Sequence, residues 1–134
     1  MAEKIEKDGV LYAIIHRKED WNKGLDFFTP DDSFIQAGTF WYGKTHRCRA
    51  HRHIKNDRPN EFTQECNIVM AGSMLATIYD KDNQVIQTEV IRAGDLIVVL
   101  AGGHGYEILE DNTKVVECKN GPFVSVEKDK IPII

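Results

Sequence analysis

Three histidines and one carboxylate are spaced so that they could bind a metal ion. His51 and His53 are separated by one residue, so on an extended strand both imidazoles would point to the same face. Glu65 begins the next predicted strand, and His104 follows two glycines after another. Neutral imidazoles and a carboxylate suit a divalent transition metal such as Zn, Fe, Mn or Ni. We therefore predict a metal site at His51, His53, Glu65 and His104, although a His-x-His pair alone also occurs on ordinary surface strands.

Two basic side chains are candidates for holding an acidic group of a ligand. Arg49 shares the predicted inward face of the two histidines, and a guanidinium can grip a carboxylate or phosphate with two parallel hydrogen bonds. Arg49 could instead lie at the mouth of a barrel and reach solvent or a structural carboxylate. Lys119 shares a strand face with Glu117, so it either forms a surface salt bridge or projects into the cavity.

Further polar side chains fall on the same inner face by strand alternation. Asn67 lies inward with Glu65, and Tyr106 lies inward with His104. An amide and a hydroxyl suit an oxygen-rich small molecule. Asn67 therefore joins the two basic residues as a predicted ligand-binding residue. Glu65 and Tyr106 are the predicted catalytic residues, with Glu65 acting either as a ligand or as a base.

The elements that must position these residues are strands. No segment has a sustained helical period, whereas β-branched and aromatic clusters recur about every 8–12 residues between turn residues, which is typical of a sandwich or barrel. A short helical turn is possible at 19–28, and 79–84 reads as a hairpin turn. The predicted strands are 10–16, 33–42, 47–53, 64–71, 73–79, 84–91, 96–100, 104–109 and 114–119.

Composition and charge exclude several classes of function. A chain of 134 residues with 42% hydrophobic and 28% charged residues is expected to form one globular domain. A net charge of −4 disfavours binding to nucleic acid or to anionic lipid. The longest apolar run, 96–101, is far below the ~20 residues of a membrane span, and residues 1–8 lack the apolar core of a signal peptide. We expect a cytoplasmic protein without membrane or nucleic-acid partners.

The three cysteines do not suggest a framework of disulfides. Cys48, Cys66 and Cys118 are odd in number and scattered, with no Cys-x-x-Cys pair. Unpaired cysteine is among the residues most often buried. All three are therefore predicted to be small buried side chains.

Glycines around the candidate ligands complete a pattern that resembles the two motifs of the cupin superfamily. The first motif runs from a glycine through His-x-His to a glutamate and, after six residues, to another glycine. Here the residues in those roles are Gly43, His51, His53, Glu65 and Gly72. The second motif runs from Gly94 through an apolar strand and a turn to His104. Glu61 is an alternative carboxylate, but Glu65 fits the spacing to Gly72 and lies in a predicted strand.

This resemblance implies an all-β, cupin-type double-stranded β-helix, or jelly-roll, barrel. Residues 1–134 would form a single cupin domain, with the core barrel at about 33–119 and flanking strands at both ends. The runs 102–107 and 117–123 are similar to a subgroup of small single-domain cupins associated with bacterial surface-polysaccharide and nucleotide-sugar metabolism. A homodimer is expected, since small open β-barrels leave sheet edges and apolar patches that pairing can cover.

Three functions remain open at this stage. The first is a metal-dependent enzyme that acts on a small polar metabolite, sugar-like or acid-like. The second is a barrel that binds a sugar or metabolite without turning it over. The third is a metal-free sugar-nucleotide isomerase in which His51 or His53 is the general base. The fold alone does not choose among them.

Overall fold

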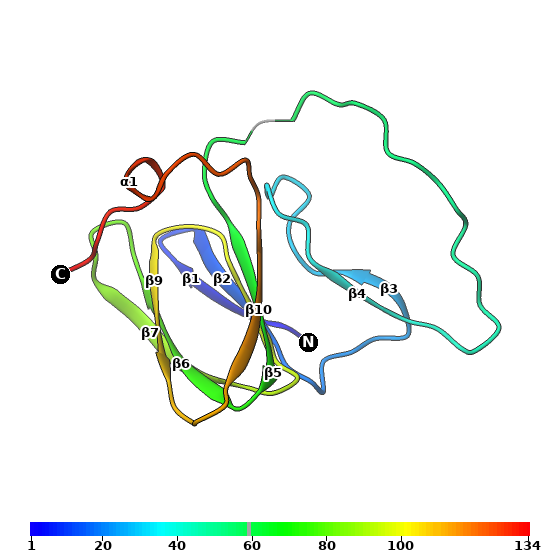
Figure 1. Cartoon of the computed structure of the whole chain (residues 1–134), viewed down its shortest axis with the longest axis horizontal. Helices are drawn as coiled ribbons and strands as arrows, with labels where there is room; N and C mark the ends of the chain where they lie inside the picture. The colour runs from blue at the N-terminus through cyan, green and yellow to red at the C-terminus, as the bar shows by residue number, and fades with distance from the viewer. Residues whose placement is uncertain (59) are drawn as a thin grey trace.

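The computed structural model describes residues 1–58 and 60–134 and confirms an all-β fold (Figure 1). The one described helix, α1 (Val126–Asp129), is a single turn. No helix in the described part of the chain has the length and apolar character needed to cross a membrane. The strands are β1 (Glu3–Lys7), β2 (Val10–His16), β3 (Gly24–Phe27), β4 (Gly38–Trp41), β5 (Glu65–Ala71), β6 (Ser73–Tyr79), β7 (Val85–Arg92), β8 (Leu96–Val99), β9 (Gly103–Ile108) and β10 (Lys114–Lys119).

The strands form two facing sheets and a separate hairpin, all antiparallel. One sheet has five strands in the order β1-β2-β8-β5-β10, and the other has three in the order β7-β6-β9. The hairpin consists of β3 and β4. The prediction of a closed barrel is therefore wrong for residues 1–58 and 60–134, because no ladder of hydrogen bonds joins the two sheets into one.

The predicted strand at 47–53 does not form. All of its residues are exposed, and the connection between β4 and β5 arcs away from both sheets (Figure 1). The physical reason lies in its composition, Arg-Cys-Arg-Ala-His-Arg-His, which offers no large apolar side chain to bury. The loss of this strand also leaves β9 paired on one side only, to β6, among the described residues.

Other predicted elements are close to those observed. Strands β2, β6 and β10 have the predicted bounds, and the turn at 79–84 joins β6 to β7 as expected. The helical turn predicted at 19–28 is wrong, because this segment carries β3, which pairs with β4. Strand β1, which pairs with β2, was not predicted, because it consists of Glu and Lys residues around one buried apolar residue, Ile5, and so has no apolar cluster.

The five-stranded sheet buries apolar side chains on both faces. Its inner face meets the three-stranded sheet in the main core, which includes Ile15, Val69, Ile78 and Ile97. Its outer face carries a second apolar cluster around Ile14 and Val98, covered in part by the segment from Phe28 to Ala37. Strands β2 and β8 are therefore nearly continuous apolar runs, and so is β5 from Ile68 to its end.

Candidate functional site

A cluster of four polar side chains lies at one end of the main core. Glu65 and Asn67 project from the start of β5, and His104 and Tyr106 project from β9 of the facing sheet. The alternation of each strand places both members of a pair on one face, as the sequence predicts. Tyr106 also packs against the main core. The core thus holds the four side chains, which we call the Glu65 cluster, between the two sheets.

One carboxylate oxygen is the centre of the Glu65 cluster. Glu65 Oε1 lies 2.9 Å from His104 Nε2. The same oxygen accepts hydrogen bonds from Asn67 Nδ2 at 2.9 Å and from the Tyr106 hydroxyl at 3.3 Å. Asn67 Nδ2 also donates to the Tyr106 hydroxyl at 3.0 Å. Three donors from two sheets therefore converge on one buried acceptor.

These contacts decide the charge of Glu65. Burial of the carboxylate raises its pKa, whereas the hydrogen bond and charge of His104, with the hydrogen bonds from Asn67 and Tyr106, lower it. The balance leaves the pKa of Glu65 below its ordinary value. Glu65 is therefore an ionised acceptor at neutral pH, which suits it to orient an imidazole.

Tyr106 is held in its protonated form. Burial raises the pKa of its hydroxyl, and the neighbouring negative charge of Glu65 raises it further. Tyr106 can therefore donate a hydrogen bond, but it does not act as a phenolate base at neutral pH. His104 is more accessible than Glu65, because its side chain is 30% exposed while that of Glu65 is 8% exposed.

The other two predicted metal ligands lie elsewhere. His51 and His53 are exposed in the connection between β4 and β5, with ring centroids 5.1 Å apart. The prediction that one strand face carries both is wrong, since no strand forms there. Within residues 1–58 and 60–134, no three His, Cys, Asp or Glu side chains come together in a way that could hold a metal ion.

The position of Arg49 depended on the same missing strand. Arg49 is exposed, and its carbonyl oxygen lies 2.9 Å from Nδ1 of His51. The predicted inward orientation of its guanidinium is therefore not found. Of the two candidate carboxylates, Glu61 is exposed in the connection, whereas Glu65 is buried and contacts His104. The structure brings together Glu65 and His104.

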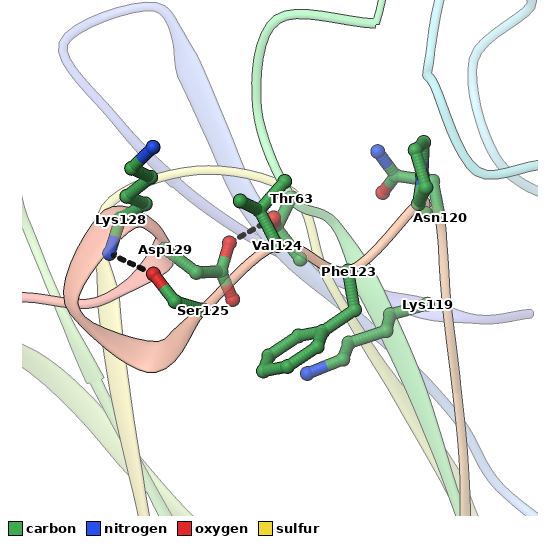
Figure 2. Close-up of a pocket in the computed structure, with 10 residues that line it drawn as sticks. Thr63, Lys119, Asn120, Phe123, Val124, Ser125, Lys128 and Asp129 are labelled. Carbon is green, nitrogen blue, oxygen red and sulfur yellow. Dashed lines mark hydrogen bonds between the residues drawn. The ribbon is translucent and has the colours of Figure 1, made fainter.

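Lys119 lies in a pocket next to the Glu65 cluster. It stands directly opposite Glu65 in the β5–β10 ladder, on the same face of the sheet. Figure 2 shows the pocket, which has a volume of about 260 Å³ and is lined by Lys119, Lys128 and the turn from Asn120 to Ser125. The pocket lining also includes the Asp129 carboxylate, which accepts a hydrogen bond from the Thr63 hydroxyl, so two cationic side chains and one anionic side chain line it (Figure 2).

Sequence reasoning singled out Lys119 but missed the other residues that line this pocket. Asn120 Oδ1 accepts a hydrogen bond from the Gln64 backbone N–H at 2.7 Å, and the Thr63 hydroxyl donates to Asp129 (Figure 2). These bonds hold the segment after β10 against the start of β5. The residues Asn120-Gly121-Pro122 are typical of a turn and could have predicted a bend. They could not have predicted that Asn120 would bond to Gln64, 56 residues earlier in the chain.

Comparison with known proteins finds no protein-family model, no curated protein and no solved structure that matches the chain.

Proposed function

We propose that the protein is a cupin-type enzyme that transfers a proton on a small polar metabolite, sugar-like or acid-like. The observation that carries this proposal is the contact of His104 Nε2 with Glu65 Oε1 inside a hydrogen-bonded cluster between two sheets. Polar groups are costly to direct into a core unless they are paired or used. His104 alone of this pair reaches solvent, so it is the group available to a substrate.

The roles follow from the contacts. When Nε2 of His104 donates to Glu65, the lone pair lies on Nδ1, which accepts a proton from a carbon or hydroxyl of the substrate. The ionised Glu65 then stabilises the imidazolium that forms. Tyr106 is protonated and donates its single hydroxyl hydrogen to the same carboxylate, so it positions Glu65; it would stabilise negative charge on a substrate oxygen only by transferring this hydrogen bond to that oxygen.

The neighbouring pocket supports an anionic substrate. Lys119 lies opposite Glu65 and lines the 260 Å³ pocket with Lys128 and Asp129. Two positive charges against one negative charge, with Asp129 already bonded to the Thr63 hydroxyl, favour a carboxylate or phosphate bound there, beside the Glu65 cluster. Asn67 stays a proposed ligand-binding residue, since its amide lies within the cluster. Arg49 stays a second proposed anchor, which would require the connection to close over the pocket.

The arrangement of the strands supports the jelly-roll part of the proposal. Five- and three-stranded antiparallel sheets face each other across one core, which is the double-sheet plan of jelly rolls and cupins. Among the described residues β9 pairs only with β6, so its other edge could accept a strand from the connection.

A metal-dependent form of the same enzyme is the second candidate. Its support is that Glu65 and His104 already contact each other, while His51 and His53 lie close together on the long connection. The two pairs are separate, so the described residues do not complete the site, and the steps above use no metal. A bound Zn, Fe, Mn or Ni ion would polarise a substrate oxygen. A non-catalytic binding barrel is the third candidate.

Exchange of hydrogen tests the proposal directly. Wild-type protein is incubated in D₂O with a panel of 2-oxo acids and nucleotide-linked ketosugars, and deuterium beside the carbonyl is followed by NMR. We expect exchange with at least one class, reduced about 10²–10⁴-fold in His104→Ala, the range typical of general acid–base catalysis. His46→Ala is the matched control, because His46 is exposed and lies outside the cluster.

The outcomes separate the three candidates. Exchange that is equally fast in His104→Ala contradicts the proposed role of His104. Elemental analysis of protein purified without an affinity tag decides the metal: stoichiometric metal that is lost in both His51→Ala and His104→Ala favours the metal-dependent form. Tight binding of a sugar nucleotide without exchange favours the non-catalytic barrel.

A further inference from the structure

Two of the three cysteines stand side by side on neighbouring strands. Cys66 on β5 lies directly opposite Cys118 on β10 in the antiparallel ladder. Directly opposite residues of such a pair project from the same face of the sheet, with their Cα atoms about 4.5 or 5.5 Å apart. A disulfide joins residues whose Cα atoms are roughly 4.4–6.8 Å apart. The ladder therefore places the two thiols where a disulfide can form.

The two thiols differ in their access to solvent. They end a row of directly opposite residues that crosses the outer face of the five-stranded sheet, and this row consists of Ile14, Val98, Cys66 and Cys118. Cys66 is 7% exposed, whereas Cys118, on the edge strand, is exposed. A reagent in solution can therefore reach Cys118, and the sheet itself supplies Cys66 as its partner.

The adjustment that a disulfide needs falls on a strand with room to move. The Cβ atoms of directly opposite residues lie about 4.5–5.5 Å apart, whereas those of a disulfide lie about 3.5–4.5 Å apart, so the strands must approach by roughly 1 Å. Among the described residues β10 pairs only with β5, and its register already shifts between Lys114 and Val115. An edge strand can make this approach without disturbing the main core.

We propose that Cys118 and Cys66 form a reversible redox site that reacts with a small disulfide of the glutathione type. The Cys118 thiolate attacks one sulfur of oxidised glutathione, which forms a mixed disulfide and releases one glutathione thiolate. Cys66 then loses its proton to water, and its sulfur attacks Cys118 Sγ and releases the second glutathione. Two protein thiols are oxidised to one disulfide, while one oxidised glutathione is reduced to two glutathione molecules.

The two steps should differ in rate. Burial raises the pKa of Cys66 to about 11, and the negative charge of Cys118 raises it further. Little Cys66 thiolate is therefore present at neutral pH, which makes the second step the slow one. Cys48 is also exposed, but it lies outside any strand and has no cysteine opposite it, so it should stop at the mixed disulfide.

The disulfide would also affect the neighbouring pocket. Lys119 and Glu65 are the next opposite pair in the same ladder, so the bond would fix β10 beside that pocket. The inference does not depend on the proposed catalysis, because it is tested by thiol chemistry alone.

Reduced full-length protein is incubated with oxidised glutathione at mildly alkaline pH, and its peptides are mapped by mass spectrometry without reductant. We expect a bond between the peptides of Cys66 and Cys118 to accumulate slowly, with glutathione on Cys48 and with native circular dichroism. Dithiothreitol should reverse both modifications. Wild-type protein that keeps glutathione on Cys118 and a free Cys66 overturns the proposal, and so does a mixture of all three cysteine pairings, which would indicate oxidation of unfolded chains.

Two variants separate the steps. Cys66→Ala removes only the second thiol, so glutathione should remain on Cys118. Cys48→Ser is the matched control, and it should form the bond between Cys66 and Cys118 at the wild-type rate. Loss of glutathione from Cys118 in Cys66→Ala as fast as in the wild type contradicts the role of Cys66. The wild-type peptide map decides the proposal even if Cys66→Ala does not fold.

Discussion

His104 on β9 and Glu65 on β5 join the two facing sheets, with Nε2 of the histidine 2.9 Å from Oε1 of the carboxylate. The two residues are 39 positions apart in the chain and belong to different sheets. The pair therefore exists only when both sheets are in place. The Glu65 cluster should therefore contribute to the stability of the fold as well as to the proposed catalysis.

Tyr106→Phe is expected to lower the free energy of unfolding by about 1–3 kcal/mol, because two hydrogen bonds of roughly 0.5–1.5 kcal/mol each are removed. The hydroxyl donates to Glu65 and accepts from Asn67, and both bonds are lost. Urea unfolding followed by fluorescence measures the change. Tyr42→Phe is the control, because the Tyr42 hydroxyl bonds to no other described residue. Equal stability of both variants contradicts the network.

Gly102→Ala is expected to destabilise the fold strongly. Gly102 has a φ of +66°, and a Cβ there would lie 2.2 Å from the carbonyl oxygen of Tyr79 and 2.8 Å from the ring of Tyr12. The left-handed backbone alone costs a residue with a side chain about 1–3 kcal/mol. Gly43→Ala should be nearly neutral, because a Cβ there meets nothing within 4 Å. Thermal melts compare the two, and similar melting temperatures would refute the prediction.

Acid should weaken the hairpin turn through Asp80. A hydrogen bond from Lys7 lowers the pKa of Asp80 from 3.8 to about 2, aided by the backbone N–H of Gln84. A carboxyl group whose pKa is lower in the folded protein than in the unfolded protein stabilises the fold at every pH above the unfolded pKa. For Asp80 this contribution disappears as the pH falls from 3.8 to about 2. Asp80→Asn should flatten the fall in stability over that window, measured by urea unfolding at stepped pH. Asp82→Asn, in the same turn but exposed, should leave the profile unchanged.

The three thiols should react at different rates. All three cysteines were predicted to be buried, but only Cys66 is, while Cys48 and Cys118 are exposed. Burial raises the pKa of Cys66 to about 11, which suppresses its thiolate. Ellman's reagent should therefore titrate two thiols in the folded protein and three after unfolding. In Cys118→Ser the folded protein should show one; fast reaction of three thiols in the native state would contradict the burial of Cys66.

The β3–β4 hairpin presents an apolar face that a second copy of the chain could cover. Leu25, Phe27 and Phe40 are 59%, 57% and 64% exposed, and the register places Leu25 opposite Phe40. Light scattering is expected to give a mass about twice 15.3 kDa. Phe40→Glu should shift the protein to a monomer, whereas Val85→Glu, on β7 and 57% exposed, should not. A monomeric wild type at micromolar concentration refutes the dimer.

Local pattern determined most of the strands and the pairing of side chains within them. Clusters of β-branched and aromatic residues between turn residues predicted β2, β6 and β10 with their bounds, since such side chains favour extended backbone. The alternation of side chains along a strand placed Asn67 with Glu65. Local pattern failed at 19–28 and at 47–53, where short or polar segments carry no strong period.

Tertiary structure decided which distant residues meet. The sequence grouped His51, His53, Glu65 and His104 by their chemistry, but only packing of the two sheets brings His104 to Glu65, and the exposed connection holds the two other histidines apart from them. His16 shows the same limit, because its spacing in β2 did not reveal that Phe28 would bury both ring nitrogens. Contacts across sheets depend on the summed burial of the whole core, which no local period contains.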